Sequence, residues 1–134
     1  MNQGKILVVE DEDNISRLLT AVLEFKGYQD IQTAHNGQEG IEKYKENKPN
    51  LVLMDLEMPV MNGYEAARQI KSRFPATRLV VLSVHAGAKE RENARAAGAD
   101  GFVVKGVSYE VLVNAILGRD DSTNLSPIKG GEEP

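Results

Sequence analysis

Carboxylates gather directly after the first apolar run of the sequence and return after a later one. The run at residues 5–9 (KILVV) is followed by four acidic residues, Glu10, Asp11, Glu12 and Asp13. The run at residues 51–54 is followed at once by Asp55. This density of negative charge would repel a bare phosphate, whereas carboxylate oxygens are the ligands of hard cations. Mg²⁺ suits the set best, because it accepts one or two carboxylates, keeps several waters and takes a phosphate oxygen as a further ligand.

Two donor groups follow later apolar runs. Ser83 closes the run at residues 79–82 with a hydroxyl, and Lys105 closes the run at residues 102–104 with an ammonium group. Either residue alone would be read as structural or as part of the surface. With Asp55 as nucleophile and a metal to screen its charge, they supply donors for phosphoryl oxygens. The set therefore predicts an acyl phosphate on Asp55.

These residues can meet only if the apolar runs form neighbouring strands of one sheet. The runs predict strands at residues 5–9, 31–34, 51–54, 79–82 and 102–104. Amphipathic segments alternate with them and predict helices at residues 14–26, around Ile41 and Tyr44, from Tyr64 to Phe74, and after Ser108 with Val111, Leu112, Ala115 and Ile116 inward. With a further helix between residues 86 and 99, five such units imply an α/β fold, a doubly wound (βα)5 parallel sheet with the flavodoxin-like strand order 2-1-3-4-5. In that order the carboxyl ends of the first and third strands are neighbours.

Two segments depart from this pattern of buried faces. Between residues 86 and 99 every apolar side chain is an alanine, so a fourth helix there buries little area and should hold weakly to the sheet. From residue 119 onward the composition turns to small, polar and charged residues, which cannot form a core. We therefore expect one folded domain at residues 1–118, followed by a flexible tail or the start of a linker at residues 119–134.

Composition excludes several classes of protein. The chain of 134 residues contains no cysteine, which rules out disulfides and thiolate metal sites. Its formal charge of -4 argues against direct binding of nucleic acid, which usually requires a basic face. No stretch approaches the roughly 20 apolar residues of a membrane span. We expect a cytoplasmic protein whose partners are proteins or cations.

Four motifs occur together in a specific order and spacing. They are V-V-E-D at residues 8–11, D-L-E-M-P-V-M-N-G at 55–63, L-S at 82–83 and F-V-V-K at 102–105. In this combination the sequence resembles the receiver domain of bacterial response regulators, the CheY-like domain. The stretches L-S-V-H and F-V-V-K-G-V-S are similar to the NarL/FixJ branch, whose members usually continue into a helix-turn-helix domain.

That resemblance implies a role in two-component signalling. Asp55 would receive a phosphoryl group from a sensor histidine kinase, a phosphotransfer protein or a small phosphodonor, and Ser83 and Lys105 would hold that group. The implied ligands of Mg²⁺ are Asp11, Asp55 and the backbone carbonyl of Glu57. Ser83 and Phe102 would act as the switch that reshapes the face of the fourth strand, fourth helix and fifth strand for a downstream protein or an output domain. The domain would be no enzyme in the usual sense, since it would catalyse only its own phosphorylation and dephosphorylation.

The sequence departs from the family pattern at three positions. Glu10 stands where a second aspartate is more usual, and we expect it to reach the metal through a water molecule. Gly106 stands where the family usually has a proline. Phe102 replaces the commoner tyrosine, so a signal carried by its ring must depend on packing. His85, just beyond the fourth strand, is a candidate modulator above the phosphoryl group, with a solvated loop histidine as the alternative.

Three other classes share parts of this pattern. A phosphohydrolase of the haloacid dehalogenase type needs a second aspartate two residues after the nucleophile, where this chain has Glu57. A flavodoxin-type electron carrier needs a phosphate-binding loop after the first strand, where this chain has acids. A pseudo-receiver, which binds partners and is never phosphorylated, would have no need of Asp55 beside Asp11, Ser83 and Lys105.

Overall fold

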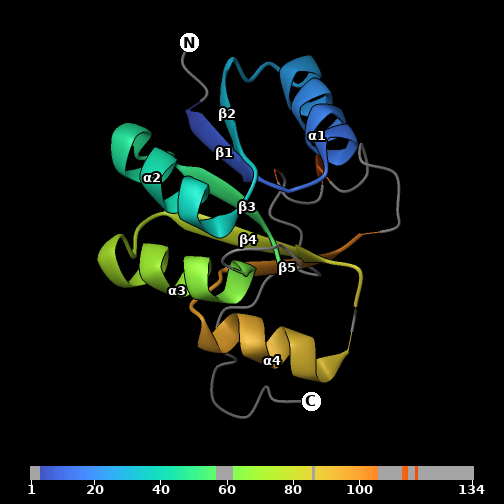
Figure 1. The fold of residues 1–134 in the computed structure, drawn as a ribbon. Helices are drawn as coiled ribbons and strands as arrows, with labels where there is room; N and C mark the ends of the chain where they lie inside the picture. Colours follow the sequence, from blue (N-terminus) through green and yellow to red (C-terminus); the bar gives the residue numbers. More distant parts are fainter. Residues whose placement is uncertain (1–3, 57–61, 86, 106–112, 115–116, 118–134) are drawn as a thin grey trace.

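The chain folds into a three-layered α/β structure around one parallel sheet (Figure 1). The computed structural model describes residues 4–56, 62–85, 87–105, 113–114 and 117. The strands are β1 (Lys5–Val9), β2 (Asp30–Ala34), β3 (Leu51–Asp55), β4 (Arg78–Ser83) and β5 (Gly101–Val104). The helices with described bounds are α1 (Asp13–Phe25), α2 (Gly37–Asn47), α3 (Gly63–Arg73) and α4 (Ala88–Ala96).

The strand order is β2-β1-β3-β4-β5 and every pairing is parallel, which confirms the predicted doubly wound fold. Each predicted strand is present, and the differences lie at the ends, where polar residues such as Asp30 and Arg78 extend the ladder by one position. The helix expected after Ser108 lies largely outside the described residues. Val113 and Leu117 are helical; Val113 belongs to the core, and the partly buried Leu117 packs against it.

Alternate residues of the strands feed two separate cores, one on each face of the sheet. The first core joins strand residues such as Leu7, Val52 and Val81 to α2, α3 and α4. The second joins residues of opposite alternation, such as Val8 and Leu53, to α1 and Val113. Figure 1 shows the same division, with α1 apart from α2, α3 and α4. The alternation follows from the period of two in an extended strand.

The amino ends of β4 and β5 are joined by Lys71, which comes from α3. Its ammonium group donates to the carbonyls of Pro75 at 2.8 Å and Thr77 at 2.6 Å, and to Asp100 Oδ2 at 2.8 Å. The same oxygen of Asp100 accepts the backbone N–H of Leu79 at 2.9 Å. One ammonium thus faces one carboxylate and two carbonyls, so the charges of Lys71 and Asp100 balance each other.

Strand β2 forms one edge of the sheet, and α2 reaches over that edge. Ala34 accepts a hydrogen bond from Glu10 N, so the backbone groups of Ala34 face β1 and those of Thr33 and His35 face outward. Lys43 donates to the carbonyl oxygen of Thr33 at 2.8 Å, and Glu39 Oε1 accepts the N–H of His35 at 2.7 Å. Side chains of α2 therefore form hydrogen bonds with two backbone groups on the outer edge of β2.

Within the described part of the chain, no helix combines the length and the apolar character that crossing a membrane requires.

Candidate functional site

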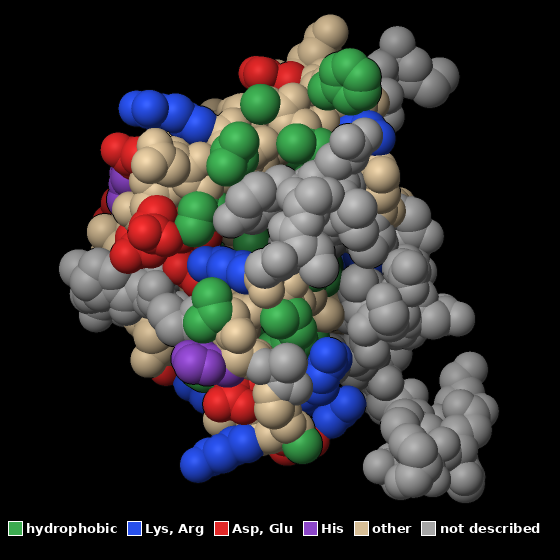
Figure 2. Space-filling model, turned by 90° about the vertical axis from the view of Figure 1, so that its right-hand side faces the viewer, with side chains coloured by type: hydrophobic (Ala, Val, Ile, Leu, Met, Phe, Trp, Pro, Cys, Tyr) green, Lys and Arg blue, Asp and Glu red, His purple; other side chains and the backbone are tan. Residues whose placement is uncertain are grey.

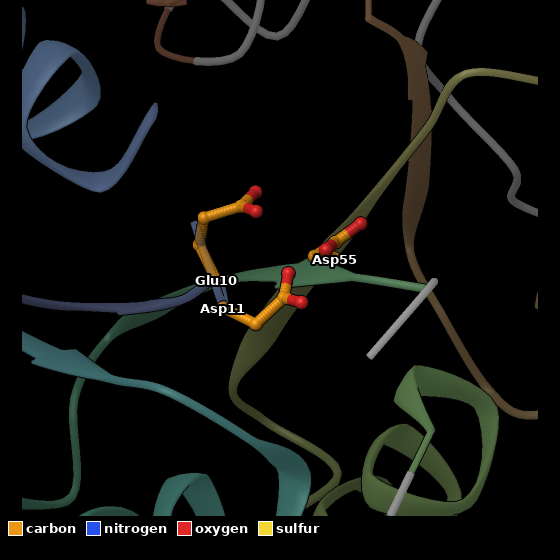
Figure 3. A group of neighbouring side chains, drawn as sticks. All are labelled: Glu10, Asp11 and Asp55. Atoms are coloured by element: carbon orange, nitrogen blue, oxygen red, sulfur yellow. The ribbon is translucent and has the colours of Figure 1, made fainter. Parts of the chain in front are cut away.

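Three carboxylates converge at the carboxyl ends of the neighbouring inner strands β1 and β3. Glu10 and Asp11 follow β1 directly and Asp55 is the last residue of β3, a strand paired with β1. Ligand atoms of the three side chains lie within 4.8 Å of one another. Figure 3 shows the carboxylates turned into a common space. The structure therefore brings together three of the five acidic residues that the sequence placed after these strands.

The alternation of the strands explains which side chains meet. Side chains two residues apart in a strand point to the same face of the sheet. Glu10 therefore lies on the face of Val8, Asp55 on that of Leu53 and Lys105 on that of Val103. Those three apolar residues belong to the core shared with α1. Ser83 points to the opposite face of the sheet, like Val81, which belongs to the core under α4. Glu10, Asp55 and Lys105 thus lie on the side of the sheet that α1 covers, and Ser83 lies on the side that α4 covers.

Lys105 lies between two of the carboxylates. Its Nζ donates to Asp55 Oδ1 at 2.9 Å and forms an ion pair with Glu10 Oε1 at 3.2 Å. The side chain of Lys105 is 8% exposed and that of Glu10 is fully buried. The other oxygen of Glu10 accepts the backbone N–H of Glu12 at 3.3 Å. Glu10 therefore contacts Lys105 directly, an ion pair that the sequence analysis did not foresee.

Burial and charge shift the pKa values of this cluster. Burial of the carboxyl, together with the charge of Asp55, raises the pKa of Glu10 from 4.5 to about 7, although Lys105 opposes that rise. Burial alone would lower the pKa of Lys105, but the hydrogen bond and charge of Asp55 and the charge of Glu10 outweigh it and raise the pKa. The cluster thus carries more negative charge than its single ammonium group neutralises.

The donor set fits a hard cation. Glu10 Oε1 is buried, and its contact with Lys105 lacks the geometry of a hydrogen bond. Among the described residues, Glu10, Asp11 and Asp55 form the one group of three or more potential ligands close enough to hold a metal ion. Carboxylate oxygens with room for water are the ligands that Mg²⁺ prefers. Glu57, whose backbone carbonyl is the further predicted ligand, lies outside the described residues, so its role stays a prediction.

Ser83 is buried at the carboxyl end of β4, one strand away from Asp55. Its Oγ accepts the backbone N–H of His85 at 3.0 Å, and its carbonyl accepts the N–H of Lys105 at 2.7 Å. These bonds fix the hydroxyl and bind the end of β4 to the end of β5. The side chain of His85 is exposed, and its predicted role as a modulator remains a prediction.

The end of β3 is held by a close approach of α3. A Cβ on Gly63 would lie 2.3 Å from the backbone oxygen of Asp55, which no side chain can tolerate. Gly63 N donates to the carbonyl of Leu56 at 3.2 Å, and Asn62 caps the helix by accepting Glu65 N at 3.0 Å. The Asn-Gly pair that ends the motif at residues 55–63 thus lets a helix begin directly against the backbone of Asp55.

Phe102, the predicted switch residue, is 1% exposed and belongs to the core under α4. The guanidinium of Arg91 in α4 lies 4.8 Å from the centre of its ring. The alanines of this helix predicted its weak packing, whereas the contact of Arg91 was not predicted. The sequence spacing could have predicted this contact, because Arg91 precedes Ala94 by three residues and so shares a helix face with it.

The surface at this edge of the sheet combines acidic, basic and apolar groups. Figure 2 shows acidic side chains and a basic side chain next to one another, with hydrophobic side chains on either side. Val84, which follows Ser83, is 57% exposed. Gly106, the predicted departure after Lys105, lies outside the described residues.

Comparison with known proteins gives consistent matches. Residues 6–117 match the model of the response regulator receiver domain. The transcriptional regulatory protein LnrK of Bacillus subtilis is 36% identical over 114 residues, covering 84% of this chain and 52% of LnrK. The chemotaxis protein CheY of Thermotoga maritima is 35% identical over 112 residues, covering 84% of this chain and 93% of that protein.

A solved structure agrees with these sequence relatives. The two-component response regulator of the LuxR family from Aurantimonas sp. SI85-9A1 is 30% identical with a TM-score of 0.80, covering 90% of this chain and 87% of that chain. This neighbour is consistent with the predicted NarL/FixJ resemblance. The chain spans about half the length of regulators such as LnrK and nearly the whole of the chemotaxis protein.

Proposed function

Because this chain belongs to the response regulator receiver domains of two-component signalling, we propose that it accepts a phosphoryl group on Asp55 and passes the signal to the α4 face. The observation that carries the proposal is the position of the Asp55 carboxylate. It lies beside Glu10 and Asp11, and Lys105 donates to it at 2.9 Å. An aspartate in this setting can act as a nucleophile toward phosphorus.

In the proposed reaction, an oxygen of Asp55 forms a bond to phosphorus while the bond between phosphorus and its donor atom breaks. The donor is a sensor histidine kinase, a phosphotransfer protein or a small phosphodonor. Lys105 stabilises the charge of the phosphoryl oxygens, and the Ser83 hydroxyl orients them from the other side of the sheet edge. The product is an acyl phosphate, and the domain acts on no other substrate.

Mg²⁺ fits the carboxylates of Glu10, Asp11 and Asp55, with Glu57 as the further proposed ligand through its carbonyl. When bound, it supplies charge neutralisation for the carboxylates and the incoming phosphoryl oxygens. Lys105 then no longer has to compensate two carboxylates at once. Its ammonium group can then turn toward the phosphoryl group and donate to the phosphoryl oxygens, the role predicted from the sequence.

The output that we propose is a change at the face formed by β4, α4 and β5. Ser83 and Phe102 lie on the same side of the sheet in paired strands, so a movement of Ser83 toward the phosphoryl group changes the space beside the Phe102 ring. The recipient is a downstream protein or an output domain of the same polypeptide. We place this signalling in the cytoplasm, where a chain without cysteines needs no oxidising environment.

Intact mass after incubation with Mg²⁺ and acetyl phosphate tests the proposal. We expect one phosphoryl adduct on the unmodified chain, none on Asp55→Asn, and one on Asp30→Asn, a matched change of an exposed aspartate at the amino end of β2. The adduct should be lost in hydroxylamine, as an acyl phosphate requires. A folded chain that stays without adduct in the presence of Mg²⁺ would instead indicate a pseudo-receiver that binds partners constitutively.

A further inference from the structure

Helix α4 has few apolar side chains with which to hold the sheet. Ala94 is its buried residue, whereas α1 buries Leu19 and Leu23. Its N-cap, Gly87, offers no side chain to accept a hydrogen bond from the first turn. Burial of alanine contributes much less than burial of leucine, because the contribution scales with apolar area. Another contact must therefore position α4.

The contact that the structure offers is the stack of Arg91 on Phe102. The guanidinium carbon lies 4.8 Å from the ring centre, within the range of a cation–π interaction. Arg91 is half-buried and Phe102 is buried, so water competes little for the two groups. Such an interaction is stronger when it is desolvated, and the planar guanidinium of arginine stacks better than the ammonium of lysine.

The ring that Arg91 covers lies close to the candidate site along the chain and across the sheet. Phe102 pairs with Val81, two residues before Ser83, and shares the same face of the sheet. Three residues after Phe102, Lys105 N donates to the carbonyl of Ser83 at 2.7 Å. A change in Ser83 or Lys105 thus reaches the Phe102 ring through a few residues of β4 and β5.

We propose that Arg91 is a positioning residue, whose stack on the buried Phe102 ring holds α4 against the sheet and is broken when that ring leaves its place. The first half concerns the resting molecule and stands on the geometry alone. The second half rests on the proposed function, since it needs a phosphoryl group on Asp55 to move the ring. Arg91 would then determine how easily α4 is released to a partner.

Hydrogen exchange of the α4 amides in the full chain without Mg²⁺ tests the first half. We expect Arg91→Leu to speed exchange about tenfold, as the loss of a partly desolvated cation–π contact implies. Phe102→Leu should do the same, and the double variant should add little more. Arg95→Leu, on the same helix, is the matched control; it removes an exposed ion pair with Glu92 and should change the rates by less than about twofold. Equal rates in Arg91→Leu and Arg95→Leu, or full additivity in the double variant, would overturn the proposal.

A side-chain signal keeps this test independent of any loss of folding. In the unmodified chain, the Nε–H resonance of Arg91 should be shifted upfield by the ring current of Phe102, and that of Arg95 should not. Arg91→Lys should keep part of the protection of α4, because it retains the charge and loses the planar stack. An Arg91 signal at the position of an ordinary exposed arginine would refute the stack.

Addition of beryllofluoride with Mg²⁺ tests the second half. We expect the upfield shift of the Arg91 signal to disappear and α4 exchange to approach the Arg91→Leu rate. An adduct on Asp55 with the Arg91 shift intact would refute the release of α4 and leave the proposed function in place. Absence of any adduct on Asp55 would refute the proposed function and with it the release, while the resting-state measurements still decide whether Arg91 holds the helix.

Discussion

Two lysine–aspartate pairs lie at opposite ends of the sheet, at nearly equal distances and in unlike surroundings. At the amino end, Lys71 Nζ lies 2.8 Å from Asp100; at the carboxyl end, Lys105 Nζ lies 2.9 Å from Asp55. Lys71 also donates to two carbonyl groups, so its pair is complete. Lys105 instead faces a second buried carboxylate, Glu10, and its cluster has an excess of negative charge.

The comparison shows that the length of an ion pair says little about its role. A balanced pair with its hydrogen bonds satisfied contributes to the stability of the fold, and removal of Lys71 leaves two carbonyls and a partly exposed carboxylate without their common donor. An unbalanced cluster has a free-energy cost that a further cation can remove. The Lys71–Asp100 pair therefore stabilises the amino end of the sheet, whereas the cluster around Lys105 favours the binding of a cation at the carboxyl end.

The largest expected effect is on the balanced pair. Lys71→Met should lower the free energy of unfolding by about 2–3 kcal/mol, because the carbonyls of Pro75 and Thr77 and the carboxylate of Asp100 lose their common donor. Denaturant unfolding with and without Mg²⁺ measures it. The loss should be the same in both conditions, since no part of the Lys71 pair belongs to the carboxylate cluster.

Lys105→Met should destabilise the metal-free protein less, by about 1–2 kcal/mol, since Glu10 can take up a proton at modest cost when its counter-ion is removed. In contrast to Lys71→Met, most of this loss should be recovered in saturating Mg²⁺, which replaces the missing positive charge. The same denaturant series decides the matter. A loss that Mg²⁺ leaves unchanged would show that Lys105 is a structural lysine like Lys71.

Glu10→Gln should stabilise the metal-free protein above pH 7 by about 1 kcal/mol. The folded-state pKa of Glu10 is raised from 4.5 to about 7, so the folded chain holds a proton that the unfolded chain has released. This cost is absent below pH 4.5, grows between pH 4.5 and 7 and is complete above pH 7. Thermal unfolding from pH 4 to 8 should show the variant gaining on the unmodified chain over that window, while Glu46→Gln, an exposed change on α2, should not.

The smallest effect concerns a carboxylate with the opposite shift. The backbone N–H of His35 is the main cause that lowers the pKa of Glu39. Its contribution to stability is therefore complete above the unfolded-state pKa and is lost as the pH falls through the lower folded-state value. Glu39→Gln should cost at most about 1 kcal/mol at neutral pH. The cost should shrink in acid, which thermal unfolding at pH 3 and pH 7 can show.

Much of the fold was predictable because it depends on short apolar runs. Residues 5–9 and 51–54 lack polar alternation, and both form central strands covered on two faces. The alternation of strands and helices then restricted the sheet to a parallel order. The strand ends were less predictable, since Asp30 and Gly101 join the ladder by pairing with a neighbour and not by their own preference.

The candidate site was predictable as a set of residues and not as a set of contacts. The sequence placed Asp55, Ser83 and Lys105 at strand ends, and the parallel sheet brings those ends together. It did not reveal that Lys105 contacts Glu10, which depends on side-chain reach across two intervening strands. Lys71 and Asp100 were missed for the same reason, because they lie 29 residues apart and no local pattern connects them.

The hydrogen bonds from α2 to the outer edge of β2 affect how copies of this protein interact at high concentration. An open strand edge offers a row of donors and acceptors on which a second chain can add a strand, the first step of sheet aggregation. Here the outward carbonyl of Thr33 is already bound by Lys43, and the outward N–H of His35 by Glu39. Two side chains of α2 thereby take up two of the backbone groups to which an added strand would bind at that edge.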